Sequence, residues 1–290
     1  MNRYIKIVLL ILIMPYLLYS ETTTIVPYGV MVDYDKNPQK SISDTAKIMG
    51  IYVSKKYEKY RIDAEYSNTN IKYKYDSIQN LKQDDLTIVY NRYFNQYFLK
   101  IGLHHINTTD ADLGDSDTLI IALGKNNITK NGIYSYSIEG FYTYYKDGHD
   151  EYSVKKPIKI VQISPSFSFY KRISRYITNN IGFKINYQNA KQYSKKSYIS
   201  YKIEDTISYK KLFTTFKLCF GEMKSGVDDG GHIVYNSKDL LKRSYKIKVG
   251  YYIKPNTSIA ISYENSLSRE YGKVLDSTSD MSSISLNHNF

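Results

Sequence analysis

The chain has 290 residues and a formal net charge of +12, with 40 lysines and arginines against 28 aspartates and glutamates. It contains 33 tyrosines and no tryptophan, and its single cysteine, Cys219, excludes an internal disulfide framework. A positive balance of this size is compatible with nucleic-acid binding, but the N-terminal segment argues against that partner.

Residues 1–20 have the pattern of a cleavable secretory signal peptide. Arg3 and Lys6 precede an apolar run, and Ser20 offers a small residue for cleavage. The run is shorter than the roughly 20 apolar residues that a membrane-spanning helix needs. We therefore expect export, a mature domain of residues 21–290, and no contact with nucleic acid.

Beyond residue 20, apolar and polar residues alternate with a period of two, as in strands whose two faces differ. Near the C-terminal end, for example, Tyr245 and Ile247 face one side while Lys246 and Lys248 face the other. Such segments predict strands near 24–34, 44–56, 59–73, 84–94, 97–107, 117–126, 132–146, 157–170, 175–189, 197–209, 212–224, 242–253, 257–268 and 280–290. Asp205 interrupts the apolar face of its strand, and the strand 157–170, with Pro157 and Pro165, has no clear phase. A β-bulge would account for either.

The connections between these predicted strands alternate in length. Short ones such as 57–59, 95–96 and 210–211 follow even-numbered strands, whereas long polar ones such as 108–117 and 225–242 follow odd-numbered strands. Long strands, short turns at one end and long loops at the other are typical of a transmembrane barrel. A sheet in hydrocarbon must close, because an open edge would leave its backbone groups without hydrogen bonds. The sequence thus predicts an all-β fold, a closed antiparallel transmembrane β-barrel of about 14 strands, with 12 or 16 as alternatives. A soluble two-sheet protein with a tyrosine core is a further alternative.

The last predicted strand ends on Phe290 without a polar tail, and Ile284 and Leu286 alternate with polar residues before it. This ending resembles the C-terminal signature of bacterial outer-membrane barrels, although His288 stands where a tyrosine or apolar residue is usual. The resemblance implies location in the outer membrane, contact with its lipids, and recognition of Ile284, Leu286 and Phe290 by the barrel assembly machinery. In size and strand number the chain is similar to the monomeric fourteen-stranded porins of the outer-membrane protein G type. Long-chain fatty-acid transporters also have fourteen strands, but they carry an N-terminal plug for which the first predicted strand leaves no room.

The polar face of each strand is predicted to line the lumen. Alternation places there the basic residues Arg61, Lys100, Lys184, Lys202, Lys217, Lys246 and Lys248 and the acidic residues Asp63, Glu65, Glu139, Glu204 and Glu264. Five of the lysines belong to four consecutive strands, and the acids lie mainly on the third and seventh. This segregation predicts a basic wall and favours a narrow, weakly anion-preferring pore for passive diffusion of small hydrophilic solutes, without a cofactor or metal.

Other functions fit a barrel of this kind. A surface adhesion or structural barrel would have a closed lumen, and the sequence leaves open whether the loop 225–241 folds inward. A barrel protease would use rim carboxylates with His149 and Asp150, or the pair Asp84 and Asp85, because an oriented histidine can activate water. A barrel phospholipase would need a serine beside an outward histidine, and none is evident. We therefore predict no enzymatic activity.

Overall fold

The computed structural model describes residues 22–75, 77–109, 114–146, 148, 156–191, 193, 195–234 and 239–290. The predicted signal peptide lies outside these ranges, and so do His149 and Asp150 of the protease alternative. None of the helical structure in the described ranges is long and apolar enough to cross a membrane.

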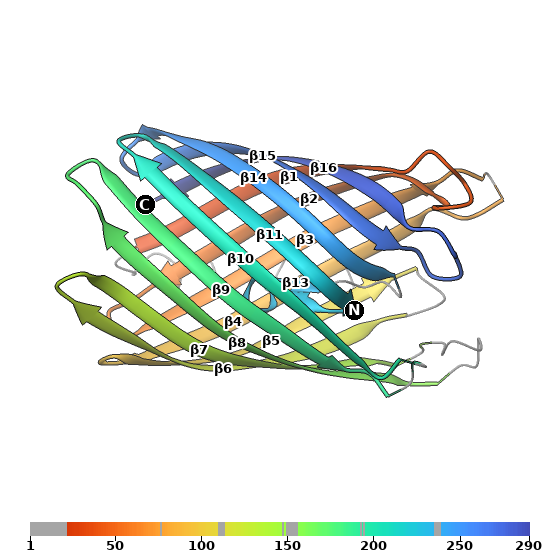
Figure 1. Ribbon diagram of the computed structural model, residues 1–290, viewed down its shortest axis with the longest axis horizontal. Coiled ribbons are helices and arrows are strands. Elements are labelled where there is room, and N and C mark those ends of the chain that lie inside the picture. The colour runs from red at the N-terminus through yellow and green to blue at the C-terminus, as the bar shows by residue number, and fades with distance from the viewer. Residues whose placement is uncertain are drawn as a thin grey trace.

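Within these ranges, fourteen antiparallel strands close into one barrel (Figure 1). The strands are β1 (Thr22–Tyr34), β2 (Ser43–Lys56), β3 (Tyr60–Tyr73), β4 (Leu81–Phe94), β5 (Tyr97–Thr108), β6 (Ser116–Thr129), β7 (Gly132–Tyr145), β8 (Ile158–Arg172), β9 (Ile177–Asn189), β10 (Ser197–Tyr209), β11 (Leu212–Lys224), β14 (Leu240–Lys254), β15 (Thr257–Arg269) and β16 (Ser277–Asn289). Short turns lie at one end of the barrel and longer loops at the other (Figure 1). The predicted fold class and strand number are confirmed, so the alternatives of 12 or 16 strands and of a two-sheet protein are wrong.

The barrel closes where β1 pairs with β16, and this seam includes the last residue of the chain. The backbone N–H of Phe290 donates to the carbonyl oxygen of Thr23 at 2.8 Å, and the N–H of Thr23 donates back at 3.4 Å. The Phe290 ring is 71% exposed and lies edge-on to His288, with 4.3 Å between ring centroids. The aromatic terminus is therefore a paired part of the barrel wall.

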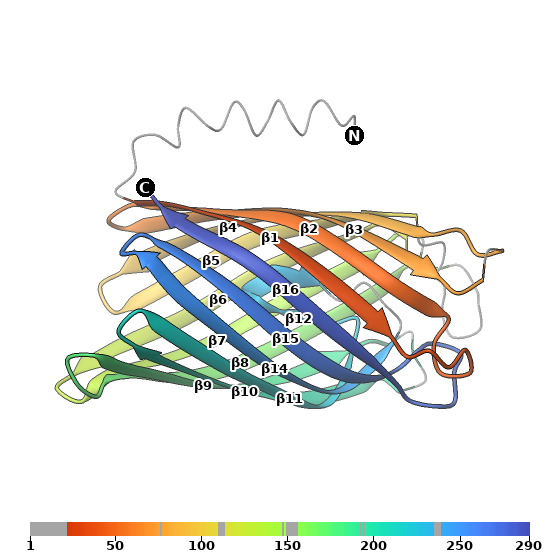
Figure 2. The same ribbon diagram turned by 90° about the horizontal axis from the view of Figure 1, so that it is seen from above.

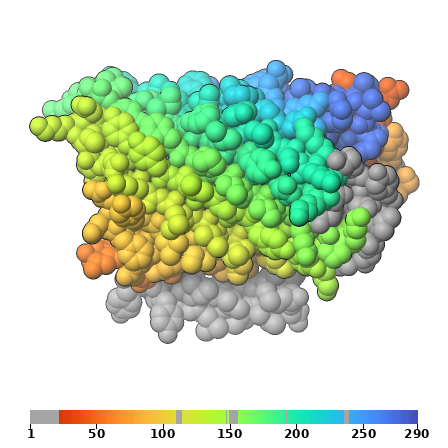
Figure 3. Space-filling view, turned by 60° about the horizontal axis from the view of Figure 1, so that its bottom comes forward, coloured from red at the N-terminus to blue at the C-terminus, as the bar shows by residue number. Residues whose placement is uncertain are grey.

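The two faces of the wall differ as the alternation predicts. Leu103 and Ile138 are 61% and 59% exposed on the outer face, while Ala122 and Glu139 on neighbouring strands are buried inside. Figure 3 shows the closed outer surface that the strands form. A large exposed apolar surface of this kind requires a cover, and a lipid bilayer covers a barrel on all sides.

Neither the strand of Asp205 nor that of Pro165 contains a bulge at these residues, so that expectation is wrong. Pro165 is exposed in phase with Val161 and Ile163, and only Asp205 interrupts the apolar face of its strand. Both β8 and β10 are described throughout, and neither shifts register at these residues. The β8–β9 ladder passes over Pro165, which has no N–H to donate, and resumes at Ser166 in unchanged register. Asp205 stays on the outer face and accepts a hydrogen bond from the side chain of Asn179.

Candidate functional site: the hairpin inside the lumen

The connection between β11 and β14 turns into the barrel rather than away from it. The register of the two strands shifts between Phe220 and Met223, where Gly221 has a φ of 100°. A Cβ at Gly221 would lie 2.5 Å from the carbonyl oxygen of Ile199, so the position requires glycine. A bulge of this kind bends a strand, and the segment that follows, residues 225–234, lies inside the barrel (Figure 2). We call it the lumen hairpin.

The lumen hairpin consists of β12 (Val227–Asp228), a single 3-10 turn (Asp229–Gly231) and β13 (Ile233–Val234). One side of it packs on an apolar patch of the inner wall. Val227 and Val234 form a buried cluster with one residue from each of β4 to β7, namely Val89, Ile106, Ile120 and Phe141. The 3-10 turn of the hairpin lies close against the wall, since a Cβ at Gly231 would be 2.2 Å from the side chain of Ile120.

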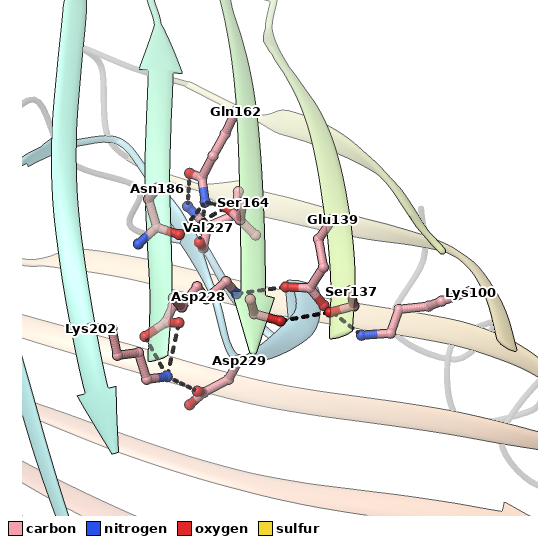
Figure 4. Close-up of polar contacts among 12 residues, drawn as sticks. Lys100, Ser137, Glu139, Gln162, Ser164, Asn186, Lys202, Val227, Asp228 and Asp229 are labelled. Atoms are coloured by element: carbon pink, nitrogen blue, oxygen red, sulfur yellow. Dashed lines mark hydrogen bonds and ion pairs between the residues drawn. The ribbon is translucent and has the colours of Figure 1, made fainter. Parts of the chain in front are cut away.

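The carboxylate of Asp228 binds two lysines of the predicted basic wall, and Figure 4 shows one of them, Lys202. Its oxygens accept from Lys202 Nζ at 3.1 Å and from Lys217 Nζ at 2.8 Å, and its side chain is only 4% exposed. Asp229 accepts a second bond from Lys202 at 2.9 Å. Burial raises the pKa of Asp228 and the neighbouring Asp229 adds to this, but Lys217 and Lys202 outweigh both, so the pKa lies below its usual value. The hairpin is therefore anionic where it meets the basic wall.

The backbone of the hairpin is held by a buried glutamine of β8. Gln162 Nε2 donates to the carbonyl oxygen of Val227 at 2.7 Å, and Gln162 Oε1 accepts from the Val227 N–H at 2.9 Å (Figure 4). A second buried glutamine, Gln188 of β9, donates to Gln162 at 3.1 Å and accepts from the N–H of Lys224 at 3.1 Å. These amides pair backbone groups that would otherwise be buried without partners.

The far end of the hairpin reaches the acidic strand β3. His232 Nδ1 lies 2.9 Å from Glu65 Oε2, and its ring is edge-on to Tyr52 with 5.5 Å between centroids. Glu65 also accepts a hydrogen bond from the hydroxyl of Tyr28 on β1. The hairpin thus spans the lumen from β10 and β11 to β3.

The structure places the charged residues predicted to line the lumen on the inner face, but it pairs most of them. Glu139 accepts from Lys100 at 2.9 Å and from Lys184 at 2.6 Å. Across the rest of the wall, the nitrogen–oxygen distances are 3.6 Å for Lys246–Glu264, 3.6 Å for Lys202–Glu204 and 3.0 Å for Arg61–Asp63. The side chain of Lys248 makes no hydrogen bond or ion pair with any residue that the structure describes.

Hydroxyl groups surround Lys248 on the inner face. Thr215 of β11 and Ser262 of β15 are its direct cross-strand neighbours. Beyond them, Thr206 bonds Thr215 at 2.9 Å and Ser283 bonds Ser262 at 2.7 Å. Toward the short turns, inner positions hold mainly small polar residues: Ser135, Ser137, Ser166, Ser168, Thr178, Asn180, Ser208, Ser258, Ser285, Asn287 and Asn289.

Sequence reasoning missed the hairpin residues that complete this site. The run Asp228–Asp229–Gly230–Gly231–His232 reads as a flexible turn, and its carboxylates have no strand alternation to place them. One signal does exist in the sequence, since the longest loop contains two adjacent acids while the lysines of β9 to β14 outnumber the acids on their own strands. Gln162 gives no comparable signal.

The residues considered for catalysis do not converge. Adjacent strand residues face opposite sides, so Asp84 lies outside, bonded to the Tyr66 hydroxyl at 2.6 Å, while Asp85 lies inside, 3.4 Å from His104 Nε2. His105 is on the outer face with Asp117, at 2.8 Å. Among the described residues no three His, Cys, Asp or Glu side chains are grouped to hold a metal ion.

No protein-family model and no curated protein matches the sequence. Solved structures do match. The CymD monoaromatic hydrocarbon channel has a TM-score of 0.55 at 8% identity, covering 94% of this chain and 90% of that one. Omp33, an outer-membrane protein of Acinetobacter baumannii, has a TM-score of 0.50 at 10% identity, covering 93% of this chain and 99% of that one. The NanC porin has a TM-score of 0.50 at 10% identity, covering 90% of this chain and 98% of that one. The fold is that of a bacterial outer-membrane barrel. Another similar structure is the toluene transporter TbuX of Ralstonia pickettii, with a TM-score of 0.54 at 7% identity, covering 94% of this chain and 90% of that one.

Proposed function

We propose that the protein is an outer-membrane channel for small hydrophilic solutes, and that the lumen hairpin narrows it and keeps its preference for anions weak. Export by residues 1–20, contact with outer-membrane lipids, and insertion through the assembly machinery by way of Ile284, Leu286 and Phe290 belong to the same proposal. The observation that supports it best is the hairpin itself, which is bound to both charged walls of a lumen whose short-turn half is lined mainly by hydroxyl and amide groups.

The lining supports a hydrophilic cargo. Serine, threonine and asparagine side chains replace the hydrogen bonds that a polar solute loses when it leaves bulk water. A hydrocarbon gains nothing from such a wall. Two observations favour a hydrocarbon cargo instead: the hydrocarbon channel among the fold neighbours, and the apolar inner patch of Val89, Ile106, Ile120 and Phe141. Val227 and Val234 of the hairpin cover that patch.

The charges near the hairpin support a weak anion preference. Apart from Glu65 at the far end of the hairpin, six lysines among the described residues meet there with five carboxylates: Lys100, Lys184, Lys202, Lys217, Lys246 and Lys248 with Glu139, Glu204, Glu264, Asp228 and Asp229. One charge pair at about 4 Å is worth roughly 4 kcal/mol at an effective dielectric of about 20, and salt in a wet lumen reduces this. A small positive excess therefore biases ion flow without excluding cations.

The test is single-channel recording in planar bilayers. The purified barrel should conduct, and its reversal potential in a potassium chloride gradient should indicate a slight preference for chloride. Permeation of sugars into proteoliposomes should exceed that of an aromatic hydrocarbon such as toluene. If neither the wild-type barrel nor a variant without the hairpin conducts, the channel is refuted in favour of a structural or adhesion barrel.

A further inference from the structure

The short-turn end of the barrel is strongly basic. Each of the six short turns in the described chain has lysine or arginine in it or at the adjoining strand ends: Lys56, Lys59, Arg92, Lys125, Lys130, Lys171, Arg172, Arg175, Lys210, Lys211 and Lys254. We call these residues the basic collar. Glu58 is the only acidic side chain in the connecting turns. No collar residue forms an ion pair with a carboxylate of the described chain, so the charge of this end is uncompensated.

The long-loop end is different, because several of its cations are paired with carboxylates. Lys242 and Arg269 share Asp276, at 2.7 and 2.8 Å, and Lys195 pairs with Glu222. The basic collar is therefore not a general consequence of the net positive charge of the chain.

The collar lies at the aromatic boundary of the outer face. Its cations stand over aromatic rings, with 5.6 Å from Arg92 to the Phe94 centroid, 5.4 Å from Lys125 to Tyr97 and 5.2 Å from Lys210 to Tyr209. These three rings are exposed on the outside of the barrel. Exposed aromatic rings of membrane barrels lie at the boundary between hydrocarbon and headgroups. The collar cations are thus at the depth of the lipid phosphates.

Three lysines of the collar surround one shallow pocket. It lies between the β10–β11 turn and the β14–β15 turn, which are neighbours at the short-turn end (Figure 1), and it is lined by Lys210, Lys211, Tyr252, Lys254 and Pro255. The two turns are joined by a hydrogen bond of 2.8 Å from the Tyr252 N–H to the carbonyl oxygen of Lys211. Three lysines and a tyrosine among the lining residues suit a phosphate, whose oxygens accept charge-assisted hydrogen bonds.

We infer that the basic collar binds the phosphate groups of anionic phospholipids in the leaflet on the short-turn side, with the Lys210–Lys211–Lys254 pocket as its main site. The inference rests on the proposed membrane location of the barrel. A membrane leaflet is the occupant that matches the charge pattern, because cations are present at every turn around the barrel. A single soluble anion would need only one cluster.

The test uses the folded barrel in detergent and measures, by native mass spectrometry, how much phosphatidylglycerol or phosphatidylcholine of the same acyl chains stays bound. Each interfacial lysine that meets an anionic headgroup favours binding by about fivefold at low ionic strength. We expect at least that preference for phosphatidylglycerol, decreasing as salt is added, and no displacement by equimolar inorganic phosphate. Equal retention of the two lipids, or displacement by phosphate, would overturn the inference. Both outcomes are measured on the wild-type barrel.

Variants locate the site. Lys210→Gln, Lys211→Gln and Lys254→Gln together should remove most of the preference, while Lys→Arg at the same three positions should keep it. The matched control removes three exposed charges at the other end, with Lys36→Gln, Lys191→Gln and Lys196→Gln, and should bind as the wild type does. If the control loses as much lipid as the pocket variant, the site assignment is wrong. If the barrel retains phosphatidylglycerol but passes no current, the proposed channel function is refuted and the lipid-binding inference stands.

Discussion

The two halves of the lumen are built from different side chains although the same fourteen strands form both. On the long-loop side the interior is packed like a protein core, with Tyr145, Ile158, Ile160 and Tyr198 in one buried cluster and the lumen hairpin in another. On the short-turn side the interior is lined by small hydroxyl and amide groups. Strand number alone would give a lumen of uniform width, so the narrow part of this barrel is made by an inserted segment and its partners.

Removing the lumen hairpin should have the largest effect on the difference between the two halves of the lumen. A variant with residues 226–234 replaced by a short glycine–serine linker should show a several-fold higher single-channel conductance and a larger chloride preference, because a physical obstruction and two carboxylates leave together. Bilayer recordings with a potassium chloride gradient measure both. Unchanged conductance would mean that the hairpin does not limit the pore, and a stronger cation preference would contradict the charge argument.

Replacing Asp228 by alanine should release the hairpin without deleting it. Lys202 and Lys217 would keep buried charges with fewer partners, and losing one member of a buried ion pair typically costs about 3–5 kcal/mol of stability. We expect faster hydrogen exchange at the hairpin amides and frequent openings to the higher conductance. The matched control is Asp229→Ala, whose carboxylate is 46% exposed, and it should have a clearly smaller effect on both measurements.

Changing the wall rather than the hairpin should alter selectivity more than conductance. With Lys217, Lys246 and Lys248 all replaced by glutamate, the reversal potential should change sign, most strongly at low salt, where the Debye length is longer. Replacing the same lysines by glutamine should bring it close to zero. A conducting triple-glutamate barrel that still prefers chloride would refute the assignment of these lysines to the permeation path.

The smallest expected effect is that of Gln162→Leu, which removes the two hydrogen bonds to Val227 but leaves the ion pairs of the hairpin intact. Leaving the buried backbone groups of Val227 unpaired costs about 1–3 kcal/mol. Hydrogen exchange should increase at Val227 more than at the barrel strands, with little change in selectivity. Exchange equal to that of the wild type would show that water replaces the amide there.

Much of the barrel could be predicted from the sequence, because strand alternation is a local signal. The predicted ranges 197–209 and 212–224 coincide with β10 and β11, and most other boundaries differ by only a few residues. The lumen hairpin could not be predicted in the same way. Its position depends on Gln162 and Glu65, which are far away in the sequence, and on the bulge at Gly221, none of which follows from alternation.

The seam between Thr23 and Phe290 also has a consequence for the order of folding. Every other strand of the barrel pairs with a neighbour in the sequence, whereas β1 and β16 are separated by nearly the whole chain. Contacts of such long separation have the greatest loop-closure entropy and form slowly. Until the last strand has been synthesised, both edge strands lack their final partner, so a chain that stops before it has two open edges and is prone to aggregate.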